Sequence, residues 1–76
     1  MRYTTSIHYH SFPNYHGPNF NILGPGGYVK MDDIPEHLRK WIDMRDDRNI
    51  ACFFRKDIAE RVAYVLTILA EAEGNV

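Results

Sequence analysis

Acidic residues are missing from the first 31 positions of the chain, where Arg2 and Lys30 are the fixed charges. Cysteine occurs once, at Cys52, which excludes a fold held by disulfides within the chain. A hydrophobic run long enough to cross a membrane is also missing, because Tyr64 and Thr67 interrupt the longest apolar stretch. No apolar leader follows the first residue, so we expect a cytoplasmic protein without membrane contact.

The chain has 76 residues, of which 45% are hydrophobic, and its net charge is −1. These values are typical of one small globular domain, which we expect to span residues 1–76. Because the charges nearly balance, we expect no direct binding to nucleic acid. A chain of this size buries only about 60% of the surface that its unfolded form exposes. Deep catalytic clefts are rare in such domains, so size alone favours a binding module over an enzyme.

The N-terminal third of the chain has the pattern of strands. Apolar or β-branched residues alternate with polar ones through residue 12, which indicates a half-buried strand. Residues 13–18 read as a loop, and Asn19–Leu23 resumes a strand with Phe20 and Ile22 inward. Gly24–Gly27 predicts a tight turn, after which Tyr28–Met31 returns as the partner strand.

Two helices and one further strand are predicted after this hairpin. Asp33 and Pro35 indicate the start of a helix, whose apolar stripe includes Trp41 as a core anchor. Residues 45–49 form a charged turn, and residues 50–54 form a buried strand that contains an unreactive Cys52. A second helix begins near residue 56 and ends at Gly74. We therefore expect an α+β fold of order β-β-β-α-β-α, with a small antiparallel sheet covered on one face by two helices.

Three histidines in the N-terminal third suggest one possible kind of chemistry. His8 and His10 point to the same side of a strand, and His16 could join them across the loop. They could bind zinc or serve as an acid/base pair for phosphodiester cleavage. However, no acid in this region can orient an imidazole, and few bases are available to hold a phosphate. A metal-dependent or histidine-based enzyme is therefore the alternative hypothesis, and we expect no metal or cofactor.

The aromatic residues around the first loop suggest a surface that binds a protein. Aromatic, amide and imidazole groups with few charges are typical of the centres of protein interfaces. The alternative interpretation is that some of these aromatic residues fill the core. The predicted interface consists of three aromatic anchors and three polar contacts: Tyr9, Phe12 and Tyr15, with His10, Asn14 and His16.

The C-terminal helix carries the sequence Asp57-Ile58-Ala59-Glu60-Arg61-Val62-Ala63 and follows an aromatic strand. This arrangement resembles short accessory proteins of phages and other mobile elements, among them host-defence inhibitors such as anti-CRISPR proteins. The resemblance implies an inhibitor that blocks a partner by stoichiometric binding. It carries no catalytic residue over to this chain.

The leading hypothesis is a non-enzymatic protein-binding module, encoded by a phage or mobile element, that blocks a host defence or nucleic-acid-processing complex. Its expected partner is a protein of such a host complex. A third hypothesis is a structural subunit that forms a homodimer through the edge of its sheet.

Overall fold

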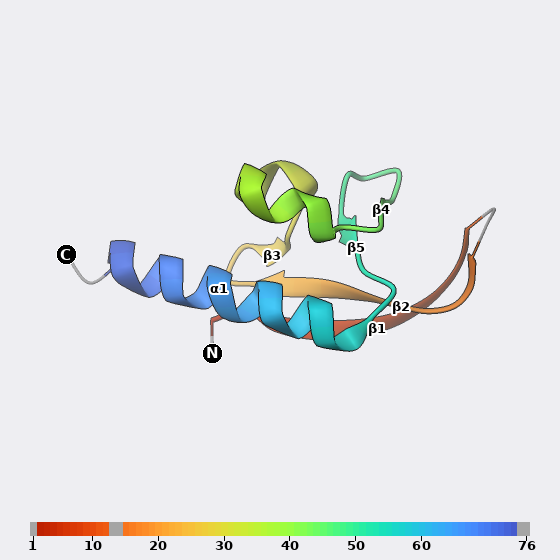
Figure 1. The fold of residues 1–76 in the computed structure, drawn as a ribbon, viewed down its shortest axis with the longest axis horizontal. Coiled ribbons are helices and arrows are strands. Elements are labelled where there is room, and N and C mark those ends of the chain that lie inside the picture. The colour runs from red at the N-terminus through yellow and green to blue at the C-terminus, as the bar shows by residue number, and fades with distance from the viewer. Residues whose placement is uncertain (1, 13–14, 75–76) are drawn as a thin grey trace.

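The computed structural model describes residues 2–12 and 15–74, without the side chains of residues 10–12. A long antiparallel hairpin, formed by β1 (Thr4–Phe12) and β2 (Tyr15–Gly24), is its largest β element. The short strand β3 (Gly27–Tyr28) extends this sheet in the order β1-β2-β3. Figure 1 shows that the far end of the hairpin projects beyond the rest of the molecule.

A second, two-stranded sheet is formed by β4 (Met44–Arg45) and β5 (Ala51–Cys52). A pair of reciprocal hydrogen bonds connects it to the first sheet. Phe20 N donates to Phe53 O at 2.7 Å, and Phe53 N donates to Phe20 O at 2.8 Å. A second bridge pairs Lys30 with Ile50, so the two sheets form one bent surface.

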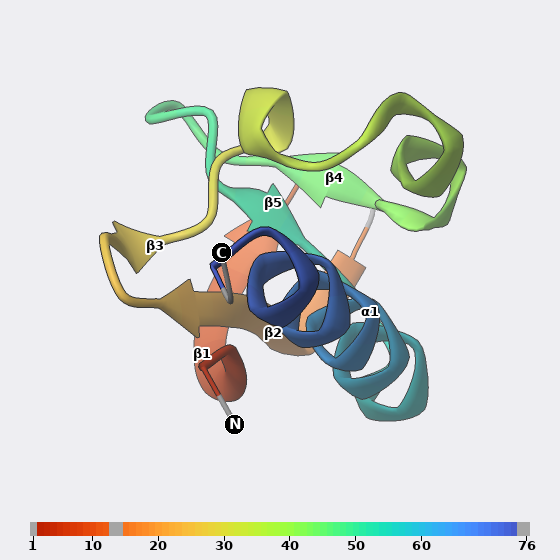
Figure 2. The ribbon, with the colours of Figure 1, turned by 90° about the vertical axis from the view of Figure 1, so that its left-hand side faces the viewer.

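The helix α1 (Lys56–Gly74) packs along β1 and β2. Figure 2, which looks along the long axis of the molecule, shows α1 beside the hairpin and β5 above β2. Ile22, Ile34 and Phe53 are fully buried, and they pack with the inner face of α1. The buried apolar positions of that face are Ala59, Val62, Ala63 and Leu66.

The expected α+β class, the antiparallel sheet and the C-terminal helix are confirmed, but the predicted element order is wrong. Instead of a helix after Asp33, the chain forms two 3₁₀ helices, η1 (Met31–Asp33) and η2 (Glu36–Trp41). The physical reason is Pro35, which lacks an N–H and disfavours the α conformation at the preceding Ile34. Ile34 is accordingly extended, with φ −94° and ψ 129°. One long helix, not two, therefore covers the sheet.

Other boundaries also differ from the sequence prediction. The partner strand expected at Tyr28–Met31 is only the short β3 at Gly27–Tyr28, and β4 at Met44–Arg45 was not predicted. β2 begins at Tyr15, so the residues from Tyr15 to Pro18 belong to a strand and not to the expected loop. The strand expected at residues 50–54 is shorter, because β5 covers only Ala51–Cys52. Its neighbours Ile50 and Phe53 form single bridges with Lys30 and Phe20. The turn at residues 24–27 is found where it was predicted.

Gly24 is required by a close approach of Tyr3 at the end of the hairpin. A Cβ atom at Gly24 would lie 2.5 Å from Cε1 of the Tyr3 ring. By contrast, a Cβ atom at Gly26 would have no neighbour within 4 Å. Tyr3 packs against the core, so the ring cannot leave Gly24 without losing those contacts.

We predict that Gly24→Ala lowers the free energy of unfolding by about 1–3 kcal/mol, because the new methyl group overpacks the contact with Tyr3. Gly26→Ala is the matched control in the same turn and should leave stability within about 1 kcal/mol of the wild type. Urea unfolding followed by circular dichroism measures both. Equal stability of the two variants would contradict this account of the turn.

Candidate functional site

The projecting part of the hairpin separates the predicted interface residues onto two faces. Tyr9 is paired with Pro18, so their side chains lie on the same face of the hairpin. His16 lies two residues before Pro18 on the same strand and therefore shares this face. Tyr15, next to His16 in the chain, lies on the other face. Tyr9 is 76% exposed and His16 is also exposed. The side chains of His10 and Phe12, and all of Asn14, lie outside the described residues.

Tyr15 is fixed by contacts within the molecule. Its ring stacks on the ring of Phe54, with centroids 3.8 Å apart and an interplanar angle of 6°. Its hydroxyl donates to Pro18 O at 2.6 Å. Tyr15 is therefore part of the support of the hairpin, while Tyr9 is the predicted aromatic anchor that the structure leaves exposed.

Two of the three histidines of the alternative hypothesis, His8 and His16, lie on opposite faces of the hairpin, and the side chain of His10 is outside the described residues. His8 is paired with Asn19 and lies on the face opposite to that of His16. Nε2 of His8 is 3.1 Å from Ser6 Oγ, and its imidazole meets the Tyr28 ring edge to face at 5.4 Å. Among residues 2–12 and 15–74, no group of three or more His, Cys, Asp or Glu side chains is placed to hold a metal ion.

Two asparagines of β2 are buried on the face of the hairpin that α1 does not cover. Nδ2 of Asn21 donates to Ala51 O at 2.9 Å and lies 3.4 Å from Cys52 Sγ. Asn19 is 0% exposed, yet neither its Nδ2 nor its Oδ1 has a hydrogen-bond partner among residues 2–12 and 15–74. A buried amide without partners costs stability, whereas the Asn21 amide connects β2 to β5.

Cys52 is buried beside this asparagine pair, as expected from its apolar neighbours. Burial raises the pKa of the Cys52 thiol, and the nearby charge of Asp46 adds to this effect. The hydrogen bond from Asn21 acts in the opposite direction but is smaller. The thiol therefore stays protonated near neutral pH, which makes it a poor nucleophile.

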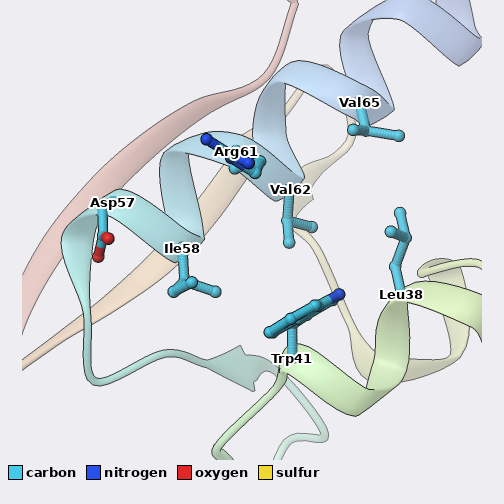
Figure 3. A pocket seen from close by; sticks show the side chains of 7 residues that line it. All are labelled: Leu38, Trp41, Asp57, Ile58, Arg61, Val62 and Val65. Carbon is cyan, nitrogen blue, oxygen red and sulfur yellow. The ribbon is translucent and has the colours of Figure 1, made fainter.

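An apolar groove lies between η2 and α1. Its volume is about 360 Å³. Leu38 and Trp41 lie on one side of it, and in Figure 3 their side chains point toward α1. Residues three apart on a 3₁₀ helix have the same direction, which explains why both face the groove. The α1 side consists of Asp57, Ile58, Arg61, Val62 and Val65.

Some charged side chains at the margin of the groove form ion pairs, and others do not. Asp57 is paired with Arg55, whose Nη2 lies 2.7 Å from Asp57 Oδ2. Lys40 Nζ lies 5.4 Å from the centre of the Trp41 ring, in a cation–π arrangement. Arg61 has no ion pair with any residue of 2–12 or 15–74. Arg61 and Lys40 are therefore left without an ion pair among the described residues.

Sequence reasoning missed this groove and misjudged Trp41. The expected core anchor is 48% exposed, because η2 ends at Trp41 and Ile42 turns away in an extended conformation. The sequence held one signal of the groove. The apolar residues of the C-terminal helix continue beyond its buried stripe to Ile68 and Leu69, both of which are exposed.

Comparison with protein-family models, with curated proteins and with solved structures finds no match for this chain. Within the described residues, no helix combines the length and the hydropathy that a membrane span requires.

We predict that Asn19→Leu raises the free energy of unfolding by about 1–3 kcal/mol, because it removes a buried amide that has no partner. Asn21→Leu is the matched control on the same strand face. It should lower stability by about 1–3 kcal/mol, since Ala51 O loses its donor. Chemical denaturation of both variants tests this pair. Destabilisation by Asn19→Leu would show that a group or water satisfies Asn19 in solution.

Proposed function

We propose that the protein is a non-enzymatic protein-binding module whose partner inserts an apolar helix face into the groove between η2 and α1. The observation that supports this proposal is the half-exposed Trp41 ring in an apolar groove. A large aromatic group at the centre of a concave apolar surface is the usual anchor of protein interfaces. Burial of this ring by a partner would therefore contribute much of the binding free energy.

The shape of the apolar surface favours a helix over a compact small molecule. Ile68 and Leu69 lie one helical turn beyond Val65 on α1 and are exposed, so the apolar surface continues along the helix. An elongated apolar surface fits the apolar stripe of an amphipathic helix, whose anchors recur every three or four residues.

The charges favour an acidic partner. Arg61 and Lys40 stand at the groove without an acidic partner among the described residues, while Arg55 already engages Asp57. An Asp or Glu beside the apolar anchors of the incoming helix would pair with these cations. The hypothesis that such a partner belongs to a host defence complex stays a prediction.

A displayed library of amphipathic helical peptides tests this proposal, with two matched sets that carry either Asp/Glu or Lys/Arg at their polar positions. We expect the acidic set to be enriched on the wild-type protein. Trp41→Ala should weaken binding of the selected peptides at least tenfold, about 1.4 kcal/mol or more. Because Trp41 is the single tryptophan of the chain, its fluorescence reports binding directly.

Two further variants serve as controls. Arg61→Glu should reverse the preference between the acidic and basic peptide sets, which a merely structural role of Arg61 would not do. Tyr9→Ala removes the exposed aromatic of the hairpin and should leave peptide affinity unchanged. Loss of binding in Tyr9→Ala with retention in Trp41→Ala would move the interface to the hairpin and overturn the groove as the site.

A further inference from the structure

The outer edge of β1 is unpaired in the described structure. β1 contains nine residues and pairs only with β2 among the described strands. Between Thr4 and Phe12 it has no proline and no Asp, Glu, Lys or Arg. Natural sheets protect long edge strands with such residues or with bulges, because an open edge pairs readily with another strand. The register of β1 with β2 is continuous and contains no bulge.

The hydrogen bonds of Phe20 determine which groups of β1 point outward. Phe20 exchanges both of its backbone hydrogen bonds with Phe53, so its neighbours Asn19 and Asn21 direct theirs toward β1. Their register partners are His8 and Ser6. The residues between and beside these two therefore direct their N–H and C=O groups away from β2. These outward residues are Thr5, Ile7 and Tyr9.

The molecule covers one end of this edge and leaves the rest open. Tyr3 N, also directed outward, donates to Thr67 Oγ1 of α1 at 3.2 Å. Thr5, Ile7 and Tyr9 have no such partner for their outward backbone groups within residues 2–12 and 15–74. Ile7 is 50% exposed, and Tyr9 is more exposed still. The open edge thus combines free backbone groups with two large exposed side chains.

We propose that this edge binds a second copy of the chain, by antiparallel pairing of β1 with β1 across a two-fold axis. The register that we infer places Ile7 opposite Tyr9 of the second copy, and Tyr9 opposite its Ile7. Both pairs are then hydrogen-bonded pairs, and each combines a β-branched with an aromatic side chain, which stabilises neighbouring strands. The axis is perpendicular to the sheet, so both α1 helices lie on the same face.

A second copy fits this edge for three reasons. A two-fold axis requires antiparallel pairing of the same strand, and this register is self-complementary. The edge has no fixed charge, so two copies meet without repulsion between like charges. A domain of this size gains from further burial of apolar surface, and the pairing removes Ile7 and Tyr9 of both copies from water.

Cysteine cross-linking tests both the pairing and its register. Residues in a hydrogen-bonded antiparallel pair have Cα atoms about 5.5 Å apart, which a disulfide can span. An oxidised equimolar mixture of Ile7→Cys and Tyr9→Cys chains should therefore give a cross-linked heterodimer. Each variant alone should give at least several-fold less cross-linked dimer. In this register, residue 7 of one copy lies two residues away from residue 7 of the other, and the same holds for residue 9. Wild-type protein, with its buried Cys52, should give none.

Mass in solution provides the second measurement. The wild-type protein should approach twice its monomer mass in light scattering as its concentration rises. Ile7→Pro removes an N–H that points outward, so it should stay folded and remain a monomer at all concentrations. Ile7→Lys, which keeps that N–H, should also weaken association by its charge. A wild-type monomer without cross-linking in the mixture would overturn the proposal. Cross-linking of Ile7→Cys alone at the level of the mixture would overturn the register.

Discussion

The reciprocal hydrogen bonds between Phe20 and Phe53 are the constraint on which the other features depend. They connect the N-terminal hairpin to the C-terminal half of the chain, and Phe53 is fully buried in the core. α1 begins at Lys56, three residues later, so this bridge also determines where the helix meets the hairpin. The same bridge sets the direction of every backbone group along β2 and, through the register, along β1.

The two proposed interaction surfaces result from this path of the chain. After η2, the chain continues into β4, which pairs with β5. Asp43, just before β4, donates its N–H to Cys52 O of β5 at 3.1 Å. η2 is therefore short and covers α1 only in part, which leaves the groove around Trp41 open. At the edge of β1 that faces away from β2, the described residues provide no further strand, and only the contact of Tyr3 N with Thr67 covers its beginning. The groove and the edge belong to different elements, so one partner need not exclude the other.

Local patterns predicted the elements that depend on local physics. Alternation predicted the first strand, glycines predicted the turn at residues 24–27, and a continuous apolar stripe predicted α1. The helix after Asp33 was predicted from its capping residues, but Pro35 and the pairing of Asp43 with β5 outweigh that preference. The groove unites residues of η2 with residues of α1 about a quarter of the chain away, so no local pattern contained it. The stacking of Tyr15 on Phe54 is equally long-range, and it removes a predicted anchor from the interface.

Amide hydrogen exchange, read residue by residue by NMR in dilute solution, tests this arrangement most directly. The bridge predicts slow exchange at Phe20 and Phe53, and alternation along β1, with slow amides at Ser6 and His8 and fast amides at Thr5, Ile7 and Tyr9. At higher protein concentration, pairing of two copies should slow the three fast amides. Fast exchange at Ser6 and His8 with slow exchange at Thr5, Ile7 and Tyr9 would contradict the proposed open edge of β1. Rapid exchange at Phe53 would contradict the bridge that positions α1.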